Sequence, residues 1–394
     1  MKNPKICIVY DRLNTRHGGA EFVLRELAMT FPEAAIVTSV LDNKEVTWIG
    51  QRKVITSFLQ NLPFAKKHHQ FFLPLMPLAF ETLDLSSFDV VISVTSAEAL
   101  GVLTTPSQLH ITYLLSPPRY LESNRKEYLR SYPLLRLPLV YQVARLFLRY
   151  VSWWYKAASK RPDIVVPLSK VVAMRAGDDY FELLEPLYPP LSMPNPELLA
   201  SAKPLPISEF LLVLSRLVWY KRVDLAIDAA KELNQKLIIA GEGAVFYSLV
   251  GQAGGKGIVR RKGESLDDFC DRASDERKLI LFTRSVTEIE KTRLLKYTAA
   301  TCMLGREDFG LVAFESLAHG SPCIIYRESG AAEIIKDGLH GCVIKNQLTQ
   351  DVVTAVRSVN NSTFSSVELK RMLDAHRPSL FRKQVKKLVY DGCL

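Results

Sequence analysis

The chain has 394 residues, which is too long for one ordinary hydrophobic core, so we expect two domains of roughly 150–200 residues each. A hydrophobic content of 48% and a charged content of 23% are typical of a folded globular protein and exclude a disordered or collagen-like chain. The net charge of +10 favours a phosphate-bearing partner or an anionic membrane surface, and the absence of zinc-finger spacing or an arginine-rich arm argues against nucleic acid.

Short β-branched runs alternate with helix-length amphipathic stretches along the chain, which indicates parallel sheets built from βαβ units. In the first half the predicted strands cover 5–10, 35–40, 88–93, 111–115 and 164–167. In the second half they cover 210–215, 236–240, 279–283, 300–304 and 322–326. Helical patterns lie between them, for example VDLAIDAAKEL at 223–233.

A proline-rich segment separates the two halves. Residues 186–207 hold seven prolines, a density that is expected to exclude regular helix and favours an extended, fairly stiff connector. We therefore predict an N-terminal domain over 1–190, a linker over 191–207 and a C-terminal domain over 208–375. The basic amphipathic segment 376–394 is expected to form a helix that packs back on the N-terminal domain.

Ligands of open parallel sheets bind beyond the carboxyl ends of the strands, and the first candidate motif lies there. Gly18 and Gly19 follow the first strand and open a helix, where adjacent glycines allow backbone N–H groups to approach a phosphate. The spacing is not GxGxxG, so a dinucleotide site is not expected. A plain glycine turn before a helix is the alternative.

Two basic residues lie in the loop between the strand at 210–215 and the next helix. Arg216 offers a planar fork of donors and Lys221 a mobile point charge, and together they could neutralise the charge on a departing diphosphate. A solvated basic loop is the alternative interpretation.

Two glutamates follow the strand at 300–304. Glu307 and Glu315 are eight residues apart across a loop and a helix start, too far apart for one acid–base dyad. They suit an elongated ligand, with hexose hydroxyls on one carboxylate, ribose hydroxyls on the other, and a diphosphate on the amides around Gly310 and Leu311.

These motifs resemble the family-4 retaining glycosyltransferases of the GT-B fold, especially the mannosyltransferase-like members that build cell-surface polysaccharides. The resemblance covers residues 5–345. Its best-matching segments are GGAE (18–21), SPPRY (116–120), YPP (188–190), SRLVWYKRVDLAIDA (215–229), AGEG (240–243), REDFGLVAFESLAHGSPCI (306–324) and SGAAEIIKDGLHG (329–341). It implies an α/β architecture of two facing Rossmann-like parallel-sheet domains with a cleft between them.

The resemblance also implies an activity, the transfer of a hexose from a nucleoside diphosphate sugar to a glycan or lipid-linked acceptor with retained anomeric configuration. GDP-mannose is the donor it favours, as a substrate, with no cofactor. Arg216 and Lys221 would bind the diphosphate, Glu307 would face the transferred sugar, and Glu315 would hold the ribose. Arg216, Lys221 and Glu307 would be the catalytic residues.

Further positions take roles from the same resemblance. Gly18 and Gly19 would close over the phosphates, and Arg284 would meet the nucleobase. Arg119 and Tyr120 would lie on the acceptor side.

The chain departs from the family at two positions. Ser96 and Leu115 stand where relatives commonly carry histidines, and the second of these is usually thought to face the reacting sugar. Two alternatives therefore stay open. The chain could be a catalytically silent donor-binding or scaffold subunit, or a GT-B nucleotide-sugar epimerase.

No metal is expected in the site. The closest match to a diphosphate-metal motif, DDFCD at 267–271, lies in the charged stretch 251–278, which we interpret as a solvated insertion rather than a loop after a strand.

The basic-aromatic segments 62–80 and 136–161 could rest on an anionic leaflet, or form a core helix with basic side chains at its rim. Three arginines interrupt the longest apolar stretch, 132–155, so a spanning helix is not expected. Scattered cysteines without a CxxC pair and a start without an apolar signal segment favour a cytoplasmic protein at the inner face of the membrane.

Overall fold

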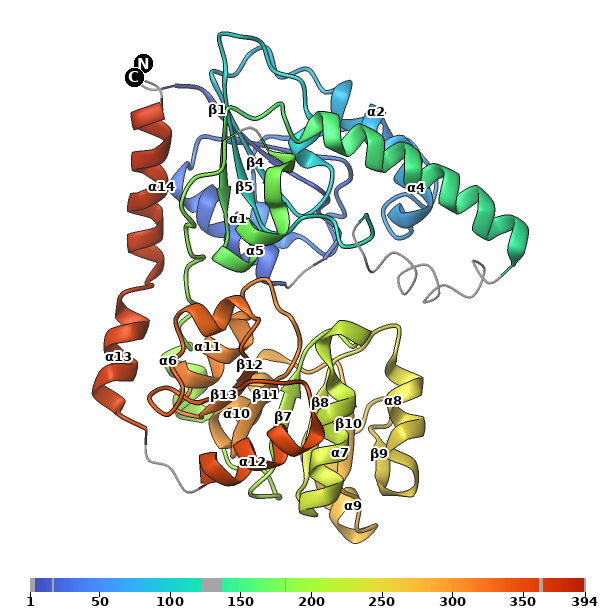
Figure 1. The fold of residues 1–394 in the computed structure, drawn as a ribbon, viewed down its shortest axis with the longest axis vertical. Helices are drawn as coiled ribbons and strands as arrows, with labels where there is room; N and C mark the ends of the chain where they lie inside the picture. The colour runs from blue at the N-terminus through green and yellow to red at the C-terminus, as the bar shows by residue number, and fades with distance from the viewer. Residues whose placement is uncertain (1–3, 16–17, 122–136, 181, 361–363, 393–394) are drawn as a thin grey trace. The chain divides into compact units, whose positions relative to one another are not determined.

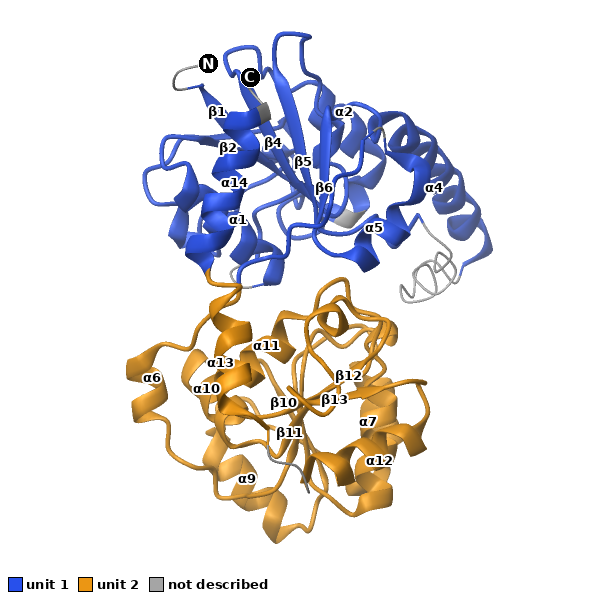
Figure 2. Ribbon diagram, turned by 60° about the vertical axis from the view of Figure 1, so that its left-hand side comes forward, with its two compact units in different colours: residues 1–190, 378–394 blue, residues 191–377 orange. Residues whose placement is uncertain are grey.

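The computed structural model describes residues 4–15, 18–121, 137–180, 182–360 and 364–392 (Figure 1). The chain divides into two compact units, Met1–Pro190 with Pro378–Leu394, and Leu191–Arg377 (Figure 2). Each unit contains one sheet of parallel strands, so the prediction of two Rossmann-like α/β domains is confirmed.

The sheet of the first unit has the order β3-β2-β1-β4-β5-β6. Its strands are β1 (Ile6–Tyr10), β2 (Ala35–Thr38), β3 (Val54–Thr56), β4 (Val90–Thr95), β5 (Leu109–Leu114) and β6 (Ile164–Pro167). Every residue of β1, β2 and β4 is buried, as expected for central parallel strands that are covered on both faces. One side of the sheet shares a core with Phe80 and Met76, which lie in a short helix, α2 (Met76–Glu81).

The other helices of this unit are α1 (Gly19–Thr30), α4 (Pro138–Ala158), α5 (Lys170–Ala176) and α14 (Pro378–Gly392). The C-terminal helix α14 packs on α1, and Arg382 forms an ion pair of 3.2 Å with Glu26. Phe381 is buried edge-on against Tyr113 of β5. The last helix in the sequence therefore belongs to the unit built by the first half of the chain.

The sheet of the second unit has the order β13-β12-β11-β7-β8-β10-β9. Its strands are β7 (Leu211–Leu214), β8 (Leu237–Ala240), β9 (Gly257–Val259), β10 (Ile280–Arg284), β11 (Ala300–Met303), β12 (Cys323–Tyr326) and β13 (Cys342–Ile344). Its helices are α6 (Pro196–Ser201), α7 (Val223–Leu233), α8 (Phe246–Ala253), α9 (Leu266–Asp275), α10 (Glu288–Tyr297), α11 (Leu311–Ala318), α12 (Thr349–Asn360) and α13 (Ser366–Asp374).

The expectation that proline excludes helix from 191–207 is wrong, because α6 lies in this segment. Asn195 caps the helix by accepting a hydrogen bond from the Glu197 N–H, and Pro196 occupies the first turn, where its missing N–H leaves no bond unmade. The hydroxyl of Tyr297 donates to the Ala202 carbonyl at 2.8 Å. The segment is thus held against α10 of the second unit.

The prediction of a solvated insertion at 251–278 is also wrong. This stretch supplies the edge strand β9 and the helix α9, from which Leu266, Phe269 and Cys270 enter the core. Its charged residues lie on the outer side, where Arg272 pairs with Glu264 at 2.7 Å. A high density of charge therefore marks one face of an amphipathic helix here.

Within the described parts of the chain, no helix combines the length and the hydropathy that crossing a membrane requires.

Candidate functional site

The carboxyl ends of the strands in the second unit define where its ligand site should lie. The chain adds β8, β10 and β9 on one side of β7, and β11, β12 and β13 on the other. The order therefore reverses between β7 and β11, and ligands of open α/β sheets bind at such a point. Lys221 follows β7 and Glu307 follows β11, so the two residues flank this reversal.

The loop after β7 holds its basic residues at defined positions. Leu217 is buried and its N–H donates to the Glu242 carbonyl at 2.8 Å, which anchors the loop. Arg216 is exposed, with one guanidinium nitrogen 3.4 Å from the Tyr220 hydroxyl. Arg222 adopts a left-handed conformation at the start of α7 and pairs with Asp224 at 2.9 Å. The loop thus presents Arg216 to solvent while Arg222 stays engaged with the helix.

Lys221 and Glu307 form an ion pair in which the ammonium contacts both carboxylate oxygens. Their side chains are 18% and 11% exposed, so the pair is largely shielded from water. The Lys221 ammonium also lies 5.5 Å from the centre of the Tyr220 ring. Two of the predicted catalytic residues are therefore in direct contact.

Glycines bring these loops together backbone to backbone. A Cβ at Gly305, two residues before Glu307, would lie 2.3 Å from the Tyr220 carbonyl oxygen and 2.7 Å from the Lys221 Cα. A Cβ at Gly241 would lie 1.9 Å from the Ser215 carbonyl oxygen. The loops after β7, β8 and β11 pack this closely only because these positions lack side chains.

The helix α11 begins at the same edge of the sheet. Gly310 caps it with a φ of 98°, a left-handed conformation that favours glycine, and Leu311 is its first residue. Unpaired N–H groups and the helix dipole make this end attractive to an anion. Gly310 and Leu311 are thus placed where a phosphate group could bind.

Glu315 lies in α11 and pairs with Lys291 of α10 at 2.8 Å. Its backbone carbonyl also contacts the Nδ1 atom of His319 at 2.7 Å. Lys291 has no motif around it in the sequence, and only the packing of α10 beside α11 identifies it as a partner. Each of the two predicted glutamates therefore has its own lysine.

Arg284 ends β10 with a φ of 60°. Its guanidinium pairs with Glu242 at 3.1 Å and lies 4.6 Å from the centre of the Phe246 ring, while its carbonyl accepts from the Gly241 N–H. The hydrogen bond to Glu242 raises the pKa of Arg284. The residue thus combines a cation with an aromatic face beside it, at the end of the strand next to β8.

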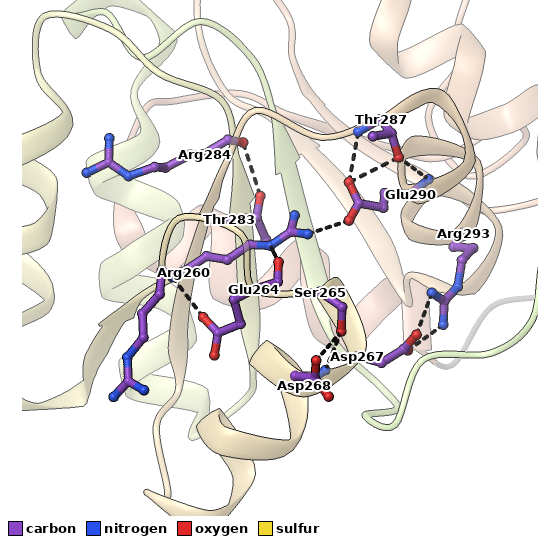
Figure 3. Close-up of polar contacts among 11 residues, drawn as sticks. Arg260, Glu264, Ser265, Asp267, Asp268, Thr283, Arg284, Thr287, Glu290 and Arg293 are labelled. Carbon is purple, nitrogen blue, oxygen red and sulfur yellow. Dashed lines mark hydrogen bonds and ion pairs between the residues drawn. The ribbon is translucent and has the colours of Figure 1, made fainter.

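The acidic cluster at 267–271 has a structural role (Figure 3). The guanidinium of Arg293 binds Asp267 and holds the pKa of that carboxyl below its usual value. Asp268 accepts from the Ser265 hydroxyl at 2.7 Å at the start of α9. Across the residues that the structure describes, no group of three or more histidine, cysteine, aspartate or glutamate side chains is placed to hold a metal ion.

The remaining predicted residues lie in the first unit. Gly18 caps α1 and Gly19 is its first residue, and both are exposed. Arg119 and Tyr120 follow β5, and the Tyr120 hydroxyl donates to a carboxylate oxygen of Glu98. Leu115, where relatives carry a histidine, is a buried aliphatic residue at the end of the same strand.

A buried charged network in the first unit was not predicted. The order of this sheet reverses between β1 and β4. Asp11 follows β1 and accepts hydrogen bonds from the Thr95 hydroxyl at 2.7 Å and from the Ser96 and Ala99 amides at 2.9 and 2.8 Å. The sequence did contain a signal for this network, because the charged residues Asp11 and Arg12 come directly after the apolar strand β1.

Comparisons with known proteins agree with this architecture. Residues 201–374 match the family described as "Glycosyl transferases group 1". No curated protein matches the chain.

Several solved structures match nearly the whole chain. HepE from Anabaena, in complex with UDP and glucose, is 14% identical with a TM-score of 0.65, and the match covers 98% of this chain and 100% of that one. Sucrose-phosphate synthase from Thermosynechococcus elongatus is 13% identical with a TM-score of 0.64, covering 98% of both chains. WaaG, a glycosyltransferase involved in lipopolysaccharide biosynthesis, is 12% identical with a TM-score of 0.57, covering 97% of this chain and 99% of that one. The chain therefore has the GT-B fold, and its residues 201–374 are similar to the group 1 glycosyltransferase domain.

Proposed function

We propose that this protein is a retaining glycosyltransferase of the family-4, mannosyltransferase-like type, which moves a hexose from a nucleoside diphosphate sugar to a glycan or lipid-linked acceptor. The observation that carries the proposal is the Lys221–Glu307 pair at the point where the strand order of the second unit reverses. A cation and a carboxylate held side by side match a donor whose diphosphate adjoins a hydroxyl-rich sugar.

The chemistry follows from this pairing of charges. The bond between the anomeric carbon and the diphosphate breaks, and a bond to the acceptor oxygen forms on the same face of the sugar. The departing phosphate takes the acceptor proton. Arg216, Lys221 and the amides at Gly310 and Leu311 stabilise the charge on that phosphate, which is the role a divalent metal has in other enzymes. The reaction is therefore proposed to need no metal.

The two glutamates serve different parts of the donor in this proposal. Glu307 receives the hydroxyls of the transferred hexose, and Glu315 those of the ribose. Their pairing with different lysines, Lys221 and Lys291, supports separate subsites. Gly18 and Gly19 close over the phosphates, Arg284 and the adjoining Phe246 meet the base, and Arg119 lies with Tyr120 on the acceptor side.

GDP-mannose remains the proposed donor, on the strength of the family resemblance. A related structure holds UDP-glucose, so both donors enter the test. Calorimetry with GDP, UDP, GDP-mannose and UDP-glucose identifies the donor, and product analysis with labelled donor identifies the reaction. A labelled glycan supports the transferase, whereas a labelled free epimer of the donor supports an epimerase.

A silent donor-binding subunit is the second candidate, favoured by the buried aliphatic Leu115. Single-turnover transfer by wild type, Lys221→Ala and Leu115→His, with a membrane extract as acceptor source, separates the two functions. The proposed transferase is active as wild type and nearly inactive as Lys221→Ala. Tight donor binding by an inactive wild type, with activity gained in Leu115→His, would establish the silent subunit.

We propose further that the first unit rests on an anionic membrane surface at the cytoplasmic face. The helix α4 exposes Leu139, Leu146 and Trp153, each seven residues from the next and 63–77% exposed. This spacing places them on one side of the helix, and the buried residues of α4 lie only from Leu148 onward. The core-helix interpretation therefore accounts for the C-terminal half of α4 alone.

Vesicle flotation tests this placement. Wild type should float with vesicles that contain phosphatidylglycerol and stay behind with pure phosphatidylcholine. The double change Leu146→Glu and Trp153→Glu should abolish flotation. Val367→Glu, at an equally exposed apolar residue of α13, is the matched control and should float as wild type does.

A further inference from the structure

A glutamine after the edge strand β13 bonds to both loops that carry the Lys221–Glu307 pair. Gln347 follows β13 and is half-buried. Its Oε1 atom accepts from a guanidinium nitrogen of Arg222 at 3.3 Å, and its Nε2 atom donates to the Leu304 carbonyl at 2.7 Å. Arg222 comes directly after Lys221, and Leu304 shortly before Glu307. One side chain therefore connects the loop after β7 with the loop after β11.

The segments at both ends of this bridge are fixed by other contacts. Arg222 has a left-handed conformation with a φ of 53°, and its guanidinium binds both carboxylate oxygens of Asp224 at 2.9 to 3.2 Å. Leu304 is buried, and Gly305 after it packs so closely that a Cβ there would lie 2.7 Å from the Lys221 Cα. The glutamine thus joins two segments whose backbones already touch.

The loop that carries Gln347 is anchored separately. Asn346 donates to a carboxylate oxygen of Asp351 from its backbone N–H at 3.0 Å and from its side chain at 3.2 Å. Asp351 lies in the first turn of α12, which packs on α7. Gln347 therefore reaches the two loops from a third, fixed element.

An amide has the chemistry that this bridge requires. The guanidinium of Arg222 only donates and the Leu304 carbonyl only accepts, so the side chain between them must accept at one end and donate at the other. Glutamine does both. Glutamate has the same size and could accept from Arg222, but it would turn a second acceptor toward the carbonyl. A change to glutamate therefore distinguishes the joining of both loops from the holding of Arg222 alone.

We propose that Gln347 is a positioning residue for the Lys221–Glu307 pair: by joining the two loops, it keeps the ammonium against the carboxylate. The bonds of Gln347 go to Arg222 and to a backbone carbonyl, so it acts through the loops that carry the charged groups. The proposal deepens the proposed function and rests on it, because this pair is the observation that carries that function.

Amine labelling of the full-length protein tests this role without any ligand. The rate at which acetic anhydride modifies Lys221, followed by mass spectrometry, reports how often its ammonium leaves Glu307. Gln347→Ala should raise this rate roughly fivefold, the effect of losing one hydrogen bond that favours the paired state. Gln347→Glu should raise it as well, because the new side chain cannot donate to the Leu304 carbonyl.

Two controls separate this role from general stability. Lys291, which pairs with Glu315 at 2.8 Å in the same unit, should be acetylated at its wild-type rate in both variants. Gln252→Ala removes an amide of α8 that donates two hydrogen bonds to α7, and it should lower Tm while leaving the labelling of Lys221 unchanged.

Single-turnover transfer at saturating donor connects the pair to the reaction. Gln347→Ala should be at least several-fold slower than wild type, and Gln252→Ala should not. Slow labelling of Lys221 in either Gln347 variant, an equal rise in Gln252→Ala, or faster labelling without slower transfer would overturn the proposal. A wild type that transfers nothing would count against the proposed reaction, and labelling alone would then decide whether Gln347 holds the pair.

Discussion

Replacing Glu307 by glutamine keeps the size of the side chain and removes the negative charge opposite Lys221. Two unit charges 4 Å apart interact by about 1 kcal/mol in water and about 4 kcal/mol at an effective dielectric constant of 20. Because the two side chains are 18% and 11% exposed, the pair lies between these limits, and we take about 1–3 kcal/mol as its strength.

The free nucleoside diphosphate should respond to this change by binding more tightly. If the diphosphate binds Lys221 as proposed, its phosphates compete with Glu307 for the ammonium in wild type and have no such competitor in Glu307→Gln. Without this competition, the nucleoside diphosphate should bind more favourably by about 1–2 kcal/mol, which corresponds to roughly a 5- to 30-fold lower Kd.

The sugar nucleotide should not share this gain, because it also loses hydrogen bonds from hexose hydroxyls to the carboxylate. Hydrogen bonds to charged groups contribute about 1.5–3 kcal/mol, which cancels or exceeds the gain at the phosphates. The Kd of the sugar nucleotide divided by the Kd of the free nucleotide should therefore be roughly 10- to 100-fold higher in Glu307→Gln than in wild type.

Calorimetry on wild type, Glu307→Gln and Glu315→Gln measures this ratio for the donor and its free nucleotide. Glu315→Gln should weaken both ligands to the same extent, because both carry the ribose. Glu276→Gln removes an exposed carboxylate that pairs with Arg272 at 3.5 Å on α9, and it should change neither constant. Equal losses for both ligands in both Glu307→Gln and Glu315→Gln would refute the division of the donor between the two glutamates.

Three further outcomes are expected. Excess EDTA should leave donor binding and transfer unchanged, and recovery of lost activity by added manganese or magnesium would contradict the proposed charge balance. Burial lowers the pKa of His110 to about 3. Below about pH 6.5 the unfolded chain therefore binds a proton that the folded chain does not, and the free energy of unfolding should fall by up to about 1.4 kcal/mol per pH unit. Urea unfolding should show a smaller fall in this free energy at acid pH for His110→Gln than for wild type. Gly305→Ala should displace the Lys221 loop and lower donor affinity by at least about tenfold, whereas Gly251→Ala, with open space at its Cβ, should bind normally in the same calorimetric assay.

The sequence predicted the central strands well and the edges poorly. Runs such as ICIVY at 6–10 are apolar throughout because both faces of the strand are covered, and this pattern is visible without knowledge of its neighbours. The three-residue strands β3, β9 and β13 carry no such pattern, and pairing with a neighbouring strand alone defines them. Composition gave wrong predictions for two helices. The prolines did not exclude α6, because proline is tolerated in the first turn of a helix. The charged residues did not make α9 a solvated insertion, because charge can occupy one face of a helix whose other face is buried.

For the candidate site, the strand ends in the sequence predicted where candidate residues lie, but not which of them contact one another. Lys221 and Glu307 are 86 residues apart in sequence, and only the adjacency of β7 and β11 brings them into contact. Asp11 and Ser96 meet across β1 and β4 in the same way. Pairings of this kind depend on strand order, which a single sequence does not encode locally.

The strand order of each sheet reverses at one point, between β1 and β4 in the first unit and between β7 and β11 in the second. The residues at these two points differ in charge, and that difference bears on the ligand proposed for each unit. In the first unit Asp11 already accepts from the Ser96 and Ala99 amides, which are the kind of donors that would otherwise cradle a phosphate, and the buried Glu98 lies in the same network. A diphosphate there would meet carboxylates and find those amides occupied. In the second unit Arg216 is exposed and Lys221 pairs with the carboxylate of Glu307, with the start of α11 at the same edge. This difference in charge supports the proposal that the first unit binds a neutral, hydroxyl-rich acceptor and the second unit binds the charged donor.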